Sequence, residues 1–432
     1  MTPLEIGYIM IAAVIFLLAV GLPVALTLMA VGAGGLFAIR GARGAHFLLE
    51  SIPFSSVSNI SLIVIPLFVL MGHLAFSAGL SEKAYKAAKS WLGHIAGGLP
   101  IATVFACAGF ATVCGSSVAT AATISKVTVP EMLRAGYPQR LAAGPVAIAG
   151  ALGILIPPSG ILIIYSIATN VSIADLFIGA LIPGLLTAVV YAFGIYAMVR
   201  RDPELVQRTR MPKASWGERW KATADSWEVL VLFVVVIGAI YGGLATATEA
   251  AGIGAALAFV FALLRRNREP GAIWKGLVET GSSSASIFML MIGSAVFSVA
   301  LATTQVPTQI ASAVLGLGLS PTMLLLLLIV PYLILGCLID GISMIFITMP
   351  VVFPIIQASD INPVVFGIFV TKLVEIGAVT PPVGINAFVV HGSVPGLQIG
   401  QIFRGVIPFI FMELALIALL IFVPGIVTVA LP

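Results

Sequence analysis

The sequence predicts an all-α polytopic membrane protein built from two inverted repeats. The chain is 60% hydrophobic and only 9% charged, whereas soluble domains are about 25% charged. Its apolar runs are continuous and long enough to cross a bilayer, unlike the short alternating segments of an outer-membrane barrel. The net charge of +4 comes mostly from loops and indicates no nucleic-acid partner. Proline motifs of the first half also recur in the second half.

Ten crossings can be placed along the chain, five on each side of a polar linker at 200–227. Each half also contains an apolar segment with a small, polar centre, which we interpret as a re-entrant hairpin. Backbone that is not helical is tolerated at membrane depth only where protein or a hydrated cavity surrounds it. The predicted crossings are 5–22, 23–40, 60–79, 140–170, 174–199, 228–246, 247–264, 284–303, 362–392 and 406–428, and the hairpins are 99–134 and 321–357.

The distribution of basic residues predicts the orientation. If the N-terminus lies outside, nearly all of the 21 Lys and Arg residues fall in segments on the linker side. Only Arg40 and Arg43 fall on the opposite side, and Lys126 and Lys372 fall within membrane elements. The positive-inside rule therefore predicts a cytoplasmic linker, with both termini periplasmic.

An internal duplication is indicated by motifs that recur in the same order. PPSG at 157–160 matches PPVG at 381–384, and Pro100 and Pro321 each open a hairpin. Five crossings per half make the second copy inverted, which is the architecture of secondary transporters with broken helices. We therefore predict repeats at 1–199 and 228–432. The first two spans of each repeat, with interfacial arms at 46–59 and 269–284, would form a scaffold, and the hairpins and broken helices a transport domain.

Motifs for catalysis are missing from the sequence. It contains no Walker motif, no HExxH and no G-x-S-x-G, so we expect a transporter rather than an enzyme.

Six stretches resemble the large membrane subunit of tripartite ATP-independent periplasmic (TRAP) transporters of the DctM/SiaM type. They follow the family's order and cover nearly the whole chain: GSSVATAATI (115–124), PEMLRAGYP (130–138), IPPSGILIIY (156–165), IADLFIGALIPG (173–184), GGLATATEAAGIGAALAF (242–259) and EIGAVTPPVGINAF (375–388).

This resemblance implies sodium-driven, elevator-type uptake of a carboxylate or sugar acid, such as a C4-dicarboxylate or sialic acid, across the bacterial inner membrane. It also implies two partners, a small four-helix membrane (Q) subunit and a periplasmic substrate-binding protein (P subunit). Two features depart from the family. Gly341, Ile342 and Ser343 follow Asp340 where many relatives carry proline and threonine, and Lys372 replaces an uncharged polar residue. Both leave open whether the substrate is a C4-dicarboxylate.

The two helix breaks predict two sodium sites and an adjoining substrate site. A break frees backbone carbonyls for a hard cation, and the helix N-terminus after it suits a carboxylate. A simple packing kink is the alternative reading of each break. The first predicted sodium site contains Gly115, Ser116, Ser117, Pro157, Pro158 and Ser159, and the second contains Asp340, Gly341, Ser343, Thr380, Pro381 and Pro382; Thr120, Gly160, Gly384 and Asn386 would face the substrate or complete these sites.

Several charged residues have two possible roles. Asp340 is either a sodium ligand or a helix cap, and Glu249 of TATEAA either caps a span or takes part in transport. Lys372 and Glu375 either pair on one helix face or contact the substrate. Lys126 extends towards the cytoplasm, and Arg40 and Arg43 meet either solvent or an acidic partner.

Two alternatives to the TRAP assignment remain at this stage. One is a stand-alone sodium symporter for divalent anions, which needs no binding protein. The other is a channel or an energy-transducing membrane subunit, which would need a chain of intramembrane Lys and Glu that the sequence lacks.

Overall fold

A computed structural model describes residues 1–265 and 270–431 of the chain. These residues form helices and no strand. Seven of the helices are long and apolar enough to cross a membrane, or up to nine if each bent pair forms one span. The predicted all-α polytopic fold is therefore confirmed. The ten predicted crossings include shorter helices, such as the 17-residue α1. Arg266 and Arg268, which the orientation prediction uses, and the first residue of the 269–284 arm lie outside the described residues.

The first half runs from α1 to α10 and reproduces the predicted order of spans, hairpin and broken helix. One helix that the sequence analysis did not predict, α4, precedes the hairpin. The elements are α1 (Pro3–Ala19), α2 (Val24–Val57), the 3-10 helix η1 (Ile60–Ile63), α3 (Val64–Ser77), α4 (Leu80–Leu92), α5 (Gly98–Cys114), α6 (Ser117–Arg134), α7 (Gln139–Gly150), α8 (Leu152–Leu155), α9 (Gly160–Thr169) and α10 (Ile173–Arg200).

The linker is partly helical, and the second half repeats the order of the first. The linker contains α11 (Pro203–Thr209) and α12 (Trp216–Ala224). The second half contains α13 (Trp227–Tyr241), α14 (Ala247–Leu264), α15 (Ala272–Thr303), α16 (Val306–Gly316), α17 (Pro321–Gly336), α18 (Gly341–Ala358), α19 (Pro363–Gly377), α20 (Ile385–Ser393), α21 (Ile399–Phe422) and α22 (Gly425–Thr428).

The two predicted arms differ in how they join the spans, because only the second is continuous with one. Residues 46–59 belong mostly to α2, which bends at Gly41, where φ is +67°. A positive φ carries little penalty for glycine because it has no Cβ. The described part of the second arm belongs to α15, whose 32 residues run without a break. The predicted separation of arm and span is therefore seen in the first half. In the second half the polarity changes along α15, but polarity alone does not end a helix.

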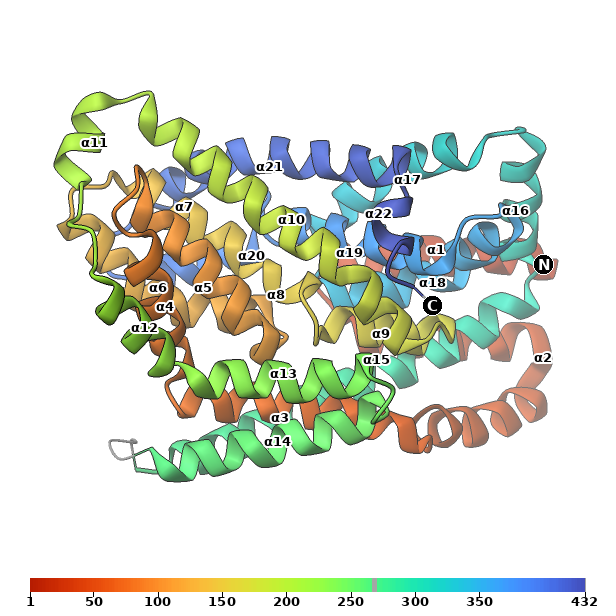
Figure 1. Cartoon of the computed structure of the whole chain (residues 1–432). Coiled ribbons are helices and arrows are strands. Elements are labelled where there is room, and N and C mark those ends of the chain that lie inside the picture. The colour runs from red at the N-terminus through yellow and green to blue at the C-terminus, as the bar shows by residue number, and fades with distance from the viewer. Residues whose placement is uncertain (266–269, 432) are drawn as a thin grey trace.

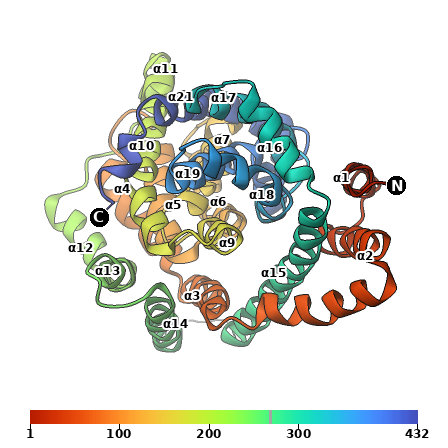
Figure 2. The same ribbon diagram turned by 90° about the vertical axis from the view of Figure 1, so that its right-hand side faces the viewer.

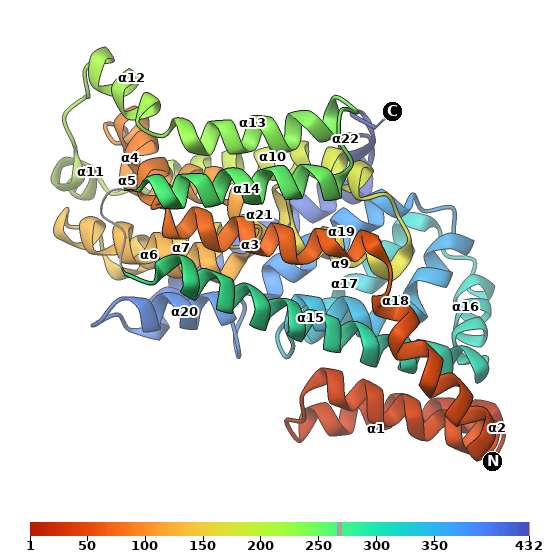
Figure 3. The same ribbon diagram turned by 90° about the horizontal axis from the view of Figure 1, so that it is seen from below.

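The helices form an outer layer against a bundle. Seen end-on, α1, α2, α3, α13, α14 and α15 make an arc along one side, and the remaining helices pack beside it (Figure 2). Figure 3 shows α1 and part of α2 set apart at the edge of this arc. The α5–α6 pair enters the bundle from one end of the molecule and the α17–α18 pair from the other (Figure 1). The division into a fixed scaffold and a moving transport domain stays a prediction.

Local residue choices explain the hairpins. Gly115 ends α5 in the left-handed region, and Ser116 caps α6 directly after it. The second pair begins with Ser320 as a cap before Pro321, and Asp340 caps α18. Ser and Asp side chains satisfy amide groups that the first turn of a helix leaves free. The helix bounds agree with the predicted hairpin ranges to within a few residues.

Candidate functional site

The first hairpin tip packs against the first break. The Gly160 amide, at the start of α9, donates to the Gly115 carbonyl at 3.4 Å. A Cβ on Gly115 would lie 2.9 Å from the Pro158 carbonyl oxygen. Contacts this close leave no room for a side chain at the tip. The structure therefore brings Gly115 together with Pro158 and Gly160, as the first predicted site requires.

The first break is buried and partly satisfied by its own serine. Pro157, Pro158 and Ser159 are all buried, and the bond between the two prolines is cis. The Ser159 hydroxyl donates to the Ile154 carbonyl and accepts from the Leu162 amide at 3.3 Å. The serine thus replaces one helical hydrogen bond that the prolines remove and caps α9.

The second hairpin tip presents a carboxylate as a helix cap. Asp340 Oδ1 accepts from the amides of Ile342 and Ser343, each at 3.1 Å, and the Ser343 hydroxyl donates to Oδ2. The capping role that the sequence left open for Asp340 is confirmed. Asp340 is also exposed, so its carboxylate remains accessible to a cation.

The second break is exposed, whereas the first is buried. Pro381, Pro382 and Val383 are exposed, and this Pro–Pro bond is also cis. The Thr380 hydroxyl donates to the Ile376 carbonyl at 2.6 Å. Asp340 and Gly341 line a cavity that Ser343, Thr380, Pro381 and Pro382 do not line. The second predicted set is therefore less closely assembled than the first.

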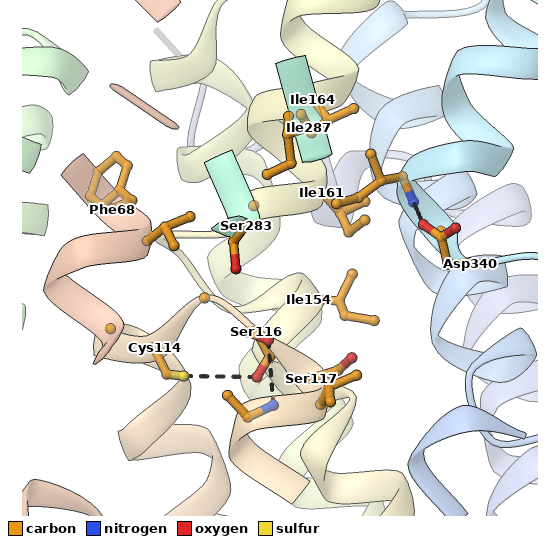
Figure 4. Close-up of a pocket in the computed structure, with 18 of the residues that line it drawn as sticks. Phe68, Cys114, Ser116, Ser117, Ile154, Ile161, Ile164, Ser283, Ile287 and Asp340 are labelled. Atoms are coloured by element: carbon orange, nitrogen blue, oxygen red, sulfur yellow. Dashed lines mark hydrogen bonds between the residues drawn. The ribbon is translucent and has the colours of Figure 1, made fainter. Parts of the chain in front are cut away.

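A cavity of about 840 Å³ lies between the outer layer and the bundle. Both hairpin tips reach it. Ser116 and Ser117 surround the same space as Ser283 of α15 and Asp340 of α18 (Figure 4). Apolar side chains of α3 and α9, including Phe68 and Ile161, complete the wall. The cavity thus combines polar helix ends from both halves with an apolar surround, the composition expected of a site for a small molecule.

Two of the four predicted substrate residues line this cavity. Gly160 and Asn386 do so, whereas Thr120 and Gly384 do not. Within the described residues, Thr120 Oγ1 and Asn386 Oδ1 are buried without a hydrogen-bond partner. Asn386 Nδ2 donates to the Ala147 carbonyl at 3.3 Å, which joins α20 of the second half to α7 of the first.

The sequence analysis missed the polar wall that α15 contributes to the cavity. Ser282, Ser283 and Ser286 line it, together with Lys275 and Glu279. The signal was the run GSSSAS inside an otherwise apolar helix, whose serines recur at helical spacing. We assigned that run to an interfacial arm and therefore did not consider it as part of the site.

The other charged groups that the sequence singles out lie in varied surroundings. Glu249 and Thr246 form a reciprocal cap at the start of α14, which confirms the capping role. His73, without ligand-like spacing in the sequence, lies 3.2 Å from Glu279. Lys126 lines the cavity, and Arg40 and Arg43 are exposed.

A buried ion pair joins Lys372 and Glu375. Their Nζ and Oε2 atoms are 2.8 Å apart, which confirms the predicted pairing. The sequence analysis did not single out Glu413, which also contacts Lys372 from α21. A lone acidic residue in the apolar run IFMELALIALL was the available signal.

A family model described as "Tripartite ATP-independent periplasmic transporter, DctM component" matches residues 11–426. The chain belongs to this family. It is 37% identical over 382 residues to the C4-dicarboxylate TRAP transporter large permease protein DctM of Pseudomonas aeruginosa, covering 88% of each chain. This DctM-family chain is thus a multi-pass transporter permease rather than an enzyme.

Two further similarities concern partners and fold. The isethionate TRAP transporter permease protein DctMQ of Oleidesulfovibrio alaskensis is 34% identical over 415 residues, which are 95% of this chain and 64% of that longer protein. The crystal structure of the YdaH transporter of Alcanivorax borkumensis matches with a TM-score of 0.63 and 17% identity, covering 89% of each chain. At that identity the YdaH match shows the shared fold alone.

Proposed function

We propose that this DctM-family permease carries an organic anion, a carboxylate or sugar acid, into the cell by an elevator mechanism driven by sodium. The main support for this proposal is that both hairpin tips and the first break line the same cavity. Asp340, with the serines at the first tip, offers oxygen ligands of the kind that hard cations prefer. The N-termini of α6 and α18 offer amide groups and partial positive charge to an anion.

The sodium sites are the two predicted sets, centred on Ser116 and on Asp340. Each negative charge carried into a cell at 100 mV, negative inside, costs about 2.3 kcal/mol. Two sodium ions therefore cancel the charge of a dianion, and a monocarboxylate with two sodium ions gains from the membrane potential. Two sites related by the repeat are therefore the smallest number that offsets the charge of a dianion, leaving the sodium concentration gradient to drive its uptake.

We further propose two protein partners for this chain. The family description is tripartite and periplasmic, which supports delivery of the substrate by a periplasmic binding protein. The length of the DctMQ relative beyond the part matched by this chain supports a small membrane subunit, separate or fused. We place the complex in the bacterial inner membrane with both termini periplasmic, because the basic residues gather on the linker side.

Reconstitution of the three components in proteoliposomes tests this function. With an inward sodium gradient, we expect uptake of the anion that the binding protein presents, and loss of that uptake without binding protein. Uptake that persists unchanged in sodium-free buffer would contradict sodium coupling. Uptake that is independent of the binding protein would instead favour a stand-alone symporter.

Labelling of the linker tests the orientation independently of transport. A cysteine at Ala214, just before the exposed cap of α12, should react only with reagents that reach the cytoplasm. Reaction from the outside in intact cells would reverse the proposed topology.

A further inference from the structure

A buried polar cluster lies in the bundle, outside the cavity. It joins three helices. Lys372 and Glu375 come from α19, Glu413 from α21, and Thr187 and Tyr191 from α10. The side chains of Lys372, Glu375 and Glu413 are completely buried, at 0% exposure. None of the five residues lines the cavity, so the proposed transport mechanism does not use them.

Almost every polar atom in this cluster has a partner. Lys372 Nζ donates to Thr187 Oγ1 at 3.0 Å and to Glu375 Oε2 at 2.8 Å, and it forms an ion pair with Glu413 Oε2. The Tyr191 hydroxyl donates to Glu413 Oε1. Within the described residues, Glu375 Oε1 and Glu413 Oε2 are both buried without a hydrogen bond. Glu413 Oε2 contacts Lys372 as an ion pair, whereas Glu375 Oε1 has no such contact.

The charges in the cluster do not balance. It contains one ammonium and two carboxylates, and among the described residues Lys372 is the only cation paired with either glutamate. If both glutamates are ionised, the cluster carries one surplus negative charge without access to water. An uncompensated buried charge is strongly unfavourable, and two carboxylates at one site resist ionising together.

We propose that the cluster is a proton-binding site and that the proton resides on Glu375 Oε1. The proton comes from solvent and binds without any redox step. It makes the cluster neutral, with Lys372 balancing the charge of Glu413. Glu413 is the better anion because it receives the Tyr191 hydroxyl as well as Lys372, whereas Glu375 has Lys372 alone. Hydrogen bonds to the charged form of a carboxyl group favour that form.

A proton suits this site better than a metal cation. A sodium ion needs several oxygen ligands, and Glu375 Oε1 is the only carboxylate oxygen here without a contact to Lys372 or Tyr191. The proposal does not depend on the proposed function, because it concerns residues outside the cavity. Glu375 nevertheless lies one turn before the second break, so its protonation would influence the helix end from which that break starts.

Infrared spectroscopy of the complete transporter at neutral pH tests the proposal. A protonated carboxyl group has a carbonyl stretch that ionised carboxylates lack. We expect this band in the unaltered protein and expect Glu375→Gln to remove it. The control Glu218→Gln, which alters a fully exposed acid in the linker, should leave the band unchanged. Absence of the band from the unaltered protein would overturn the proposal, whether or not any variant folds.

Three further variants determine where the proton resides. Glu413→Gln should also remove the band, because Glu375 then ionises to balance Lys372. Lys372→Met should double its intensity, because both glutamates then lack a cation. Tyr191→Phe should leave its frequency unchanged if the proton is on Glu375, since the tyrosine contacts Glu413 alone. A shifted frequency in Tyr191→Phe, or an unchanged band in Glu375→Gln, would overturn the assignment.

Discussion

The first hairpin tip packs directly on the first break, whereas the second break is exposed beside its hairpin. In the first half, Pro157 to Ser159 are buried and Gly115 leaves no space against Pro158. In the second half, Pro381 to Val383 are exposed. There the close approach lies one turn earlier, between Gly377 of α19 and Gly336 of α17. Both halves carry the same proline motif. The motif therefore specifies where a helix breaks, and the neighbouring helices decide whether the break is closed.

This difference predicts unequal roles for the two proposed sodium sites. The first site is built mostly from backbone and serine groups held in place by packing. The second offers the carboxylate of Asp340 at the cavity, with its break still open. If sodium completes the second site by drawing its break and tip together, the second half is where ion binding changes the structure most. The following predictions test this asymmetry, from the largest expected effect to the smallest.

A methyl group added at Gly377 should lower stability much more than one added at Gly160. A Cβ on Gly377 would lie 2.6 to 2.8 Å from backbone atoms of Gly336, and backbone cannot move aside easily. We expect Gly377→Ala to lower stability by about 1–3 kcal/mol through overpacking, measured as a lower unfolding temperature. Gly160→Ala is the matched control, because its Cβ would lie 3.4 Å from the Gly115 carbonyl oxygen, an ordinary contact. Equal losses in both variants would show that the two approaches are not different.

Removing the Asp340 carboxylate should raise the sodium requirement of uptake more than removing the Ser116 hydroxyl. Asparagine caps helices about as well as aspartate, so Asp340→Asn should keep the start of α18 while removing the negative charge. We expect a several-fold rise in the sodium concentration for half-maximal uptake, and a smaller rise for Ser116→Ala. Proteoliposome uptake at varied sodium measures both. An unchanged sodium requirement in both variants would remove these residues from the proposed sites.

Thiol labelling should report the exposure of each break directly. In a background without native cysteines, Val383→Cys should react with a water-soluble reagent more than about tenfold faster than Ser159→Cys, because exposure governs thiol reactivity. Val383 is 38% exposed and Ser159 is 0% exposed. If the second break closes on binding, sodium and substrate should slow labelling at position 383. Equally fast labelling at both positions would contradict the difference between the breaks.

The smallest effect on stability is expected at Thr120. Its hydroxyl oxygen is buried without a partner, so Thr120→Val should change the unfolding temperature little while lowering uptake if the hydroxyl meets an ion or substrate. Asn386→Leu is its counterpart in the second half. That change also removes the hydrogen bond to Ala147, which is worth about 1 kcal/mol. Normal uptake by Thr120→Val would assign the residue to packing alone.

The fold was predictable because its breaks depend on local chemistry. Two adjacent prolines remove two backbone donors in succession, and a helix is broken at 157–158 and at 381–382. Ser and Asp mark the helix starts at the hairpin tips. The arms were predicted as elements separate from the spans. The backbone at Gly41 is not helical and separates the first arm from span 23–40, whereas α15 runs through the change in polarity without a break. Local composition shows which face of a helix meets water and does not show where a continuous helix ends.

The site was predictable only in part because its assembly depends on distant packing. Within the first predicted set, Gly115 of the tip lies against Pro158 of the break. The serines of α15 and the pairing of Glu413 with Lys372 depend on how separate helices face one another. The exposure of Pro381 depends on neighbours in the same way. A repeat in the sequence predicts equivalent motifs and does not predict equivalent surroundings.

The uninterrupted course of α15 has a mechanical consequence. At 1.5 Å per residue its 32 residues extend about 48 Å, which exceeds the roughly 30 Å of the hydrocarbon core. The same helix borders the cavity with its serines. In the first half the corresponding arm and span are separate helices, because α2 ends at Val57 and α3 begins at Val64. Because α15 is continuous, a tilt of this helix would move its cavity-lining serines together.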